Sequence, residues 1–101
     1  MPTYVVLGNW TDKGIAGFDH SDERVYAHDA EIRKHAGVEL KEIYWTQGPY
    51  DLVCVMEAPD DESIAAAMLG VAALGNTRTT TLRAFNREEF EEIRAKVADQ
   101  G

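Results

Sequence analysis

Two short segments carry apolar side chains at consecutive positions, and this pattern constrains the fold more than any other feature. The segments are 3–9 (TYVVLGN) and 51–58 (DLVCVMEA). Successive side chains of a strand point to opposite faces of a sheet, so both strands would be apolar on both faces. A sheet covered by helices on one side only should instead alternate apolar and polar residues. We therefore expect these two strands at the centre of a sheet that is covered on both faces.

Residues suited to begin and end helices divide the rest of the chain. Asp60 and Asn86 can accept hydrogen bonds from free amides at a helix start, as can Ser21. Gly37 and Gly75 stand where glycine often ends a helix. The predicted helices are 22–36 after Ser21, 61–74 after Asp60, and a last helix from Asn86, paired with Glu89, to about residue 98.

The predicted strands are 3–9, 38–46, 51–58 and 78–85, with a turn at 47–50 between the middle two. The element order is then β-α-β-β-α-β-α. A right-handed arrangement of that order gives a four-stranded antiparallel sheet with helices on one face. The sequence thus predicts an α+β chain of one domain, 1–101, with the ferredoxin-like β-α-β-β-α-β plait and an extra C-terminal helix.

The segment 10–20 is harder to assign. It contains Gly14 and Gly17 among charged residues, which is typical of a loop or one loose helical turn. The glycines suit a lid over a pocket near Trp10, and they equally suit a plain loop. Both interpretations stay open at this point.

The second apolar face of the sheet needs a cover. A second copy packed sheet to sheet would supply one, because exposed apolar patches mark protein interfaces. The alternative is that the C-terminal helix folds across that face. The net charge of −8 makes separate copies repel one another, so association through the apolar face should tolerate salt. We therefore expect a homodimer or larger homo-oligomer.

Several stretches resemble one known family. The signature G-x-Y-D is present as Gly48-Pro49-Tyr50-Asp51. Matching stretches, in chain order, are Tyr44-Trp45-Thr46, Glu57-Ala58-Pro59-Asp60, Gly75-Asn76 and the run Thr80 to Phe85. From Tyr4 to about Ile93 the chain is similar to the GYD-domain family of small bacterial and archaeal proteins. The resemblance implies a ferredoxin-like fold assembled as a dimeric α/β barrel, and it supplies no catalytic residues, because the family is largely uncharacterised.

A polar stripe on the first long helix is one candidate site. Its members recur at helical spacing beside the apolar face and are Arg24, His28, Glu31 and His35. His28 would act as a general base or a lone haem or metal ligand, and Arg24 would hold an anionic substrate. His28 and His35 are two turns apart, about 10 Å, too far to bind one ion together. The alternative is a solvated boundary face with weak contacts between neighbours.

Tyr50 and Asp51 form a second candidate at the mouth of the hairpin. A phenol beside a carboxylate could orient a ligand or work as an acid and base pair. In the alternative interpretation Asp51 accepts hydrogen bonds from amides of the turn while Tyr50 packs as a lid on the core.

Trp10 and Trp45 are the aromatic residues kept as pocket candidates, although aromatic side chains also fill cores and interfaces. Cys54 lies mid-strand between two valines. A thiol there is expected to be a small buried hydrophobe with a raised pKa, not a nucleophile.

Composition excludes several classes of protein. Ten basic residues against eighteen acidic ones argue against nucleic acid and anionic membranes as partners. One cysteine permits no internal disulfide, and no apolar run approaches the roughly 20 residues of a membrane span. Phosphate-binding and serine-hydrolase motifs are missing, which argues against nucleotide-driven chemistry and serine hydrolysis. With one cysteine and no H-x-x-x-H spacing, no cofactor and no metal site is predicted. We expect a cytoplasmic protein, since no targeting segment is visible.

These observations favour a small oligomeric protein with a ligand-binding or accessory role, whose possible ligand is a small molecule. The alternative is a cofactor-independent enzyme of the monooxygenase or isomerase type, with His28 or Asp51 as base. Haem or metal binding through His28 is a less favoured third possibility.

Overall fold

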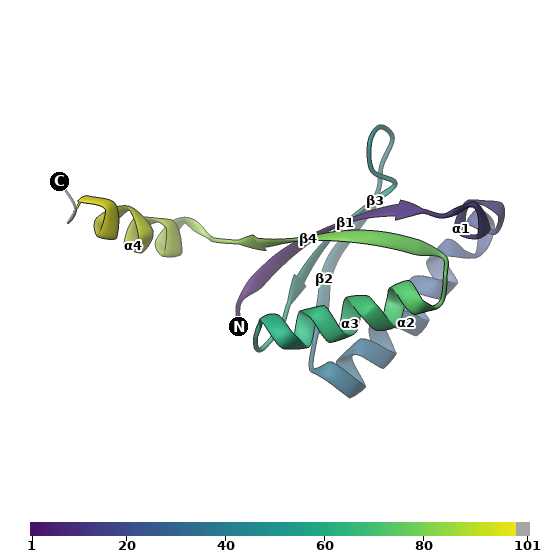
Figure 1. Cartoon of the computed structure of the whole chain (residues 1–101), viewed down its shortest axis with the longest axis horizontal. Coiled ribbons are helices and arrows are strands. Elements are labelled where there is room, and N and C mark those ends of the chain that lie inside the picture. The colour runs from purple at the N-terminus through teal and green to yellow at the C-terminus, as the bar shows by residue number, and fades with distance from the viewer. Residues whose placement is uncertain (99–101) are drawn as a thin grey trace.

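Strands and helices alternate as the sequence predicts, in the computed structural model, which describes residues 1–98 (Figure 1). The elements in chain order are β1 (Thr3–Trp10), α1 (Asp12–Ala16), the 3₁₀ turn η1 (Phe18–His20), α2 (Ser21–Ala36), β2 (Glu39–Trp45), β3 (Leu52–Glu57), α3 (Asp61–Ala73), β4 (Thr77–Ala84) and α4 (Arg87–Ala98). In this part of the chain, no helix is long and apolar enough to cross a membrane.

The strands form one antiparallel sheet in the order β2-β3-β1-β4. This order, with helices following β1 and β3, is that of the ferredoxin-like plait, so the predicted fold is confirmed. The two strands that are apolar on both faces, β1 and β3, are the central pair. Val6 lies opposite Cys54 and Tyr4 opposite Met56, which places these side chains on one face of the sheet.

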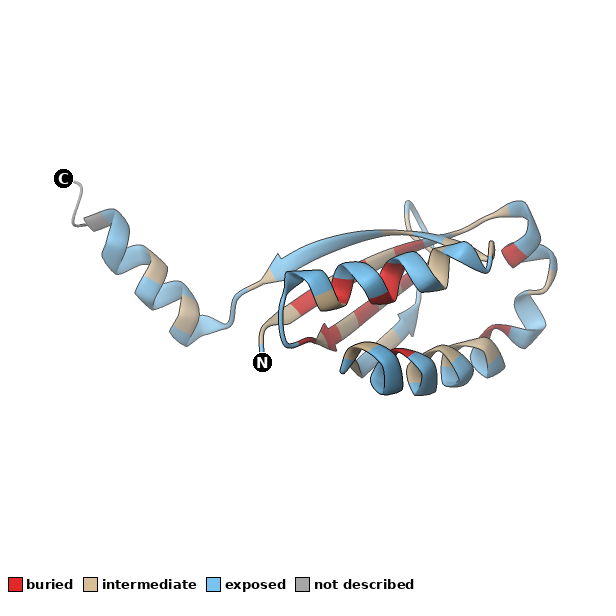
Figure 2. Ribbon diagram, turned by 60° about the horizontal axis from the view of Figure 1, so that its bottom comes forward, coloured by how far each residue is buried: buried red, intermediate tan, exposed pale blue. Residues whose placement is uncertain are grey.

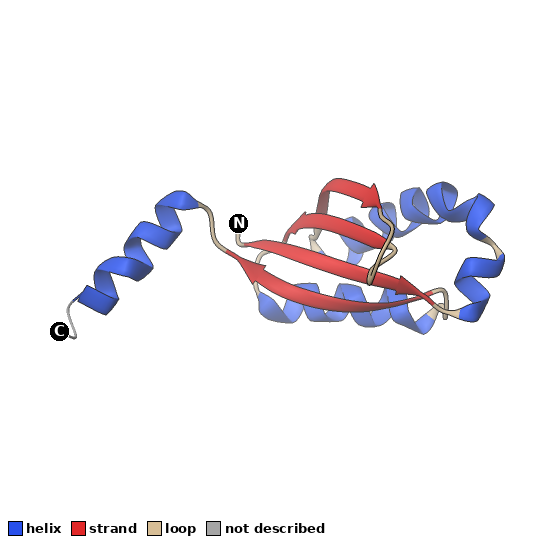
Figure 3. Cartoon of the chain, turned by 90° about the horizontal axis from the view of Figure 1, so that it is seen from above, coloured by secondary structure: helices blue, strands red, loops and turns tan. Residues whose placement is uncertain are grey.

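Helices α2 and α3 cover that inner face (Figure 3). Buried positions lie on the strands and on α3, the elements that enclose this layer (Figure 2). Ile32 from α2 and Ile64 and Met68 from α3 pack against the buried strand residues and form the core. Burial of these apolar side chains supplies the main favourable free energy of folding.

The outer face of the sheet has no helix over it in the described chain. Val5, Leu7, Val53 and Val55 on this face are half-buried by their neighbours, and Leu82 is 46% exposed. Helix α4 extends away from the sheet instead of folding across it (Figure 1). The alternative in which the C-terminal helix covers this face is therefore wrong for the single chain.

Most of the segment 10–20 forms α1 and η1, which agrees with the predicted helical turn and not with a plain loop. Thr11 caps α1 by accepting a hydrogen bond from the Gly14 amide at 3.1 Å. The Arg24 guanidinium donates to the carbonyl oxygens of Gly17 at 2.7 Å and Gly14 at 3.2 Å. These contacts make the segment an ordered wall beside the first turn of α2 and do not support the interpretation as a lid.

Most predicted helix ends are confirmed. Asp60 accepts a hydrogen bond from the Ser63 amide at 2.8 Å, and Asn86 and Glu89 cap each other's amides at 2.9 and 3.0 Å. Gly37 ends α2 in the left-handed conformation, with φ of 67°. The predicted capping role of Ser21 is wrong. Ser21 is the first residue of α2, and its hydroxyl accepts a hydrogen bond from the Trp45 indole.

Candidate functional site

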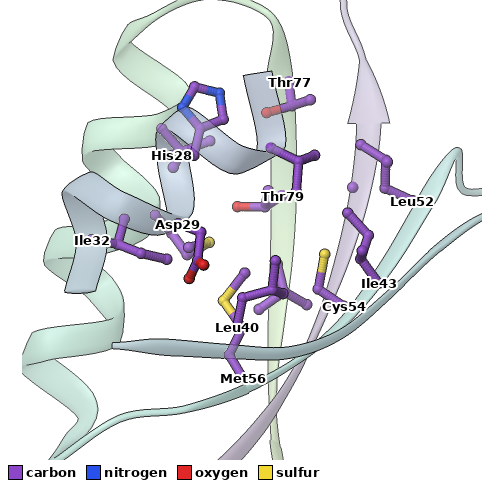
Figure 4. A pocket seen from close by; sticks show the side chains of 15 residues that line it. His28, Asp29, Ile32, Leu40, Ile43, Leu52, Cys54, Met56, Thr77 and Thr79 are labelled. Carbon is purple, nitrogen blue, oxygen red and sulfur yellow. The ribbon is translucent and has the colours of Figure 1, made fainter. Parts of the chain in front are cut away.

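A cavity lies between the inner face of the sheet and the two helices (Figure 4). Its volume is about 70 Å³, and its walls come from α2, α3 and the strands. The walls are mostly apolar and include Ile32, Leu40, Ile43, Cys54, Met56 and Val71. A cavity this size exceeds the roughly 10–15 Å³ that one water needs, but apolar walls offer water few partners. The space therefore suits an apolar group.

A wider groove of about 330 Å³ runs between α2 and α3 and shares His28, Ile32 and Val71 with the cavity. The side chains that α3 contributes to the groove are short, because they include Ala67 and Gly70. Small-molecule sites in proteins usually occupy about 300–1,000 Å³ and are lined mainly by apolar side chains with a few polar groups. The groove is at the lower end of that range.

The four residues of the polar stripe on α2 do not all face the same site. His28, Glu31 and His35 border the groove, and the His35 imidazole lies 3.0 Å from the Glu31 carboxylate. Arg24 is turned the other way and holds the carbonyl groups of Gly14 and Gly17. The histidines and the arginine therefore do not meet at one point, and the proposed pairing of Arg24 with His28 around an anion has no geometric support.

His28 belongs to both the cavity and the groove. Its side chain is half-buried, and this burial, helped by the positive charge of Arg24, lowers the pKa of the imidazole below its usual 6.5. The imidazole is therefore neutral at pH 7. A neutral ring can accept a proton or a hydrogen bond from a molecule in the groove.

Asp51 and Tyr50 line neither the cavity nor the groove, and their contacts hold the hairpin. The Asp51 carboxylate accepts a hydrogen bond from the Trp10 amide at 2.8 Å, and the Asp51 amide donates to the Gly8 carbonyl at 2.9 Å. The carboxylate therefore binds an amide of β1 and not the turn amides that the sequence interpretation expected. Tyr50 is half-buried, and its carbonyl accepts from the Thr46 hydroxyl.

The two tryptophans lie outside the walls of the groove. The Trp45 indole Nε1 donates to the Ser21 hydroxyl at 2.9 Å and so joins β2 to the start of α2. The Trp10 Nε1 is buried and finds no hydrogen-bond partner among residues 1–98. Trp10 packs beside Gly14 of α1.

Two cavity residues, Cys54 and Asp29, stand apart by their chemistry. Cys54 is buried, and burial raises the pKa of its thiol to about 11, as the sequence predicts for an inert thiol. Asp29 also lines the cavity and is not among the candidate residues chosen from the sequence. A carboxylate inside a repeat of Val25, Ile32 and Ala36 was itself the signal.

One oxygen of Asp29 has an unusual environment. Its Oδ1 is buried and has no hydrogen-bond partner within the described part of the chain. The nearest cation is the Arg33 guanidinium, with its Nη2 3.6 Å from this oxygen. Over residues 1–98, no three histidine, cysteine, aspartate or glutamate residues gather closely enough to hold a metal ion.

Comparisons with known proteins agree with this architecture. A protein of Thermus thermophilus named "Glutamine synthetase and cystathionine beta-lyase binding protein" is 39% identical over 85 residues, covering 84% of this chain and 90% of that protein. The crystal structure of TTHA0845 from Thermus thermophilus matches with a TM-score of 0.54 and 30% identity, covering 85% of this chain and 95% of that one.

The family comparison covers nearly the whole chain. The model of the GYD domain matches residues 4–93, which include the G-x-Y-D run at the turn after β2 and every element from β1 to the middle of α4. This confirms the resemblance read from the sequence, and the chain belongs to the GYD-domain family.

Proposed function

We propose that this protein is a homo-oligomeric accessory protein, which joins a second copy through the outer face of its sheet and binds an enzyme as its partner. The observation that carries the proposal is the apolar outer face that nothing in residues 1–98 covers. This outer face consists of Val5, Leu7, Tyr44, Val53, Val55 and Leu82.

The register of the strands makes the outer face continuous. Val5 lies between Val55 and Leu82, so these three form one row across three strands. Leu7 and Tyr44 flank Val53 in a second row. Contiguous apolar surface of this kind is rare on soluble monomers and marks interaction sites.

Charged residues border the outer face at one end. The Lys41 ammonium lies 3.5 Å from the Glu39 carboxylate and 3.8 Å from that of Glu57. An apolar centre with a polar rim is the usual anatomy of a protein interface. A second copy related by a twofold axis would present the same apolar rows and cover both faces at once.

The partner enzyme is inferred from the similar Thermus protein, whose name states that it binds glutamine synthetase and cystathionine beta-lyase. We assign the contact with the enzyme to α4, whose apolar stripe lies away from the sheet. Phe90 and Val97 on this stripe are 58% and 62% exposed, and Ile93 lies between them. Amphipathic helices commonly dock their apolar side into a groove of a partner.

Direct titration tests the partner. Glutamine synthetase and cystathionine beta-lyase from the source organism of this chain are immobilised in turn, and the full chain is titrated by biolayer interferometry. We expect saturable binding to at least one enzyme in the micromolar range. Phe90→Ser combined with Val97→Ser should weaken it at least tenfold, because apolar anchors dominate such contacts.

Glu92→Ser on the polar side of the same helix is the matched control and should leave the affinity unchanged. Absence of binding to both enzymes would contradict the partner assignment. Equal loss in the Glu92 variant would contradict the assignment to the apolar stripe of α4.

A further inference from the structure

We propose that the cavity and groove between α2 and α3 bind a small apolar molecule that carries one amine, with the Asp29 carboxylate as its anchor. This site lies on the helix side of the sheet, opposite the outer face. The proposal of this ligand site is therefore independent of the proposed self-association and of the enzyme contact on α4.

The inner cavity selects an apolar body for the ligand. Its floor is the inner face of β1 and β3, where Val6, Cys54 and Met56 are all buried. Leu40 and Ile43 of β2 close the side next to α2. With about 70 Å³ of space and so few polar groups, the cavity favours a ring or a branched alkyl group over several waters.

Asp29 supplies the polar end of the site. Its carboxylate points from α2 toward Leu40 and Met56 (Figure 4). The side chain as a whole keeps 28% of its surface exposed, yet Oδ1 is buried without a hydrogen-bond partner in the described chain. A buried acceptor without a donor is costly, so a ligand that donates a hydrogen bond to Oδ1 gains more than it would in water.

The charges around the groove favour a cation over an anion. Glu31 lies on the rim and is paired with His35, while His28 beside Asp29 is neutral at pH 7. The Arg33 guanidinium is the nearest positive group to Asp29, but its nitrogens lie 3.6 Å from Asp29 and 3.9 Å from Glu39, beyond hydrogen-bond distance. An ammonium group can therefore approach the carboxylate more closely than Arg33 does.

Gly70 of α3 is a position from which a larger side chain could fill the groove. Gly70 lines the groove, and a Cβ added there would meet nothing within 4 Å. Its backbone does not require glycine, because it lies inside α3 and its φ is not positive. A large side chain at this position would fill the groove without straining the helix, which gives a variant that blocks the site and leaves Asp29 in place.

The test uses phenethylamine as the probe and 3-phenylpropionate as an anionic probe of similar size. Amide chemical shifts of the full-length ¹⁵N-labelled chain are followed during titration. We expect saturable shifts in α2 and α3 with phenethylamine, at a millimolar dissociation constant. The anionic probe should bind at least tenfold more weakly, because it meets Asp29 and Glu31 and offers no donor.

Variants then locate the site and its anchor. Gly70→Phe should abolish binding, and Gly70→Ala should retain it. Asp29→Asn should weaken phenethylamine about tenfold or more, since a charge-assisted hydrogen bond is replaced by a neutral one. Glu91→Gln on α4 removes the same charge far from the groove and should leave the dissociation constant unchanged.

Three results would overturn the proposal. They are the absence of saturable shifts in wild type, saturation that persists in the Gly70→Phe variant, and an affinity that falls equally in the Asp29 and Glu91 variants. The same spectra report whether each variant is folded. If Asp29→Asn does not fold, Gly70→Phe still decides the location of the site.

Discussion

Single polar side chains join segments that lie far apart in the sequence. Asp51 accepts a hydrogen bond from the Trp10 amide, and Trp45 donates to the Ser21 hydroxyl. Removing one member of such a pair leaves a partly buried polar group unsatisfied, which costs about 1–3 kcal/mol. These contacts therefore tie the end of β1 to the start of β3 and the start of α2 to the end of β2.

His28 gives a prediction at this scale. Its pKa is lowered below 6.5 in the folded chain, first by burial and then by Arg24. As the pH falls below 6.5, the unfolded chain therefore takes up the proton before the folded chain does, and the free energy of unfolding decreases. His28→Gln removes this contribution, so its unfolding free energy should fall less steeply between pH 7 and 5 than that of wild type.

Urea denaturation at several pH values measures the slope. Above pH 7.5 His28 is neutral in both states, so there the two proteins should respond to pH in parallel, which serves as the internal control. Equal slopes for both proteins below pH 6.5 would contradict the assigned shift.

At the scale of elements, α1 depends on a close approach that a side chain would prevent. A Cβ on Gly14 would lie 1.9 Å from the carbonyl oxygen of Asn76, in the turn between α3 and β4. Gly14→Ala should therefore lower the free energy of unfolding by roughly 1–3 kcal/mol, as overpacked sites do.

Gly70→Ala is the matched control within α3, where the added methyl group meets open space. It should raise the free energy of unfolding by about 0.5–1 kcal/mol, because alanine loses less entropy in a helix. Urea denaturation of both variants measures the two changes, and effects of the same sign would contradict the packing described for α1.

The helices also show which parts of the fold can be predicted from the sequence. Helices α2 and α3 were predicted within a residue or two, because caps and glycine stops are local signals. The sequence left α1 open between a loop and one helical turn, because Gly14 and Gly17 are typical of loops. The contact that requires Gly14 is with Asn76, which is distant in the sequence. The polar stripe at His28 follows from helical spacing, which is a local signal. The apolar repeat around Asp29 indicates only that this residue faces the core. The absence of a hydrogen-bond partner for its Oδ1 depends on the strands packed beside α2, which the sequence of one helix does not show.

At the scale of the whole molecule, the chain is more extended than a compact domain. Its radius of gyration is 15.4 Å, against about 13 Å for a compact chain of 100 residues. Its extents of 53 × 31 × 19 Å reflect α4, which extends beyond the end of the sheet (Figure 1). A thin layer with an apolar outer face and a protruding helix presents two uncovered surfaces, which is the form expected of a protein that works in an assembly.

Sedimentation velocity at micromolar concentration, in low and in molar salt, tests the central claim of self-association through the outer face. Wild type should sediment as a dimer or larger species in both buffers, because apolar contacts tolerate salt. Val55→Lys places a charge in the middle of the outer face and should sediment as a monomer. Leu69→Lys makes the same charge change at a 73% exposed leucine on α3 and should sediment as wild type. A wild-type monomer, an assembly that dissolves in high salt, or a Val55→Lys protein that assembles as wild type does would contradict the claim.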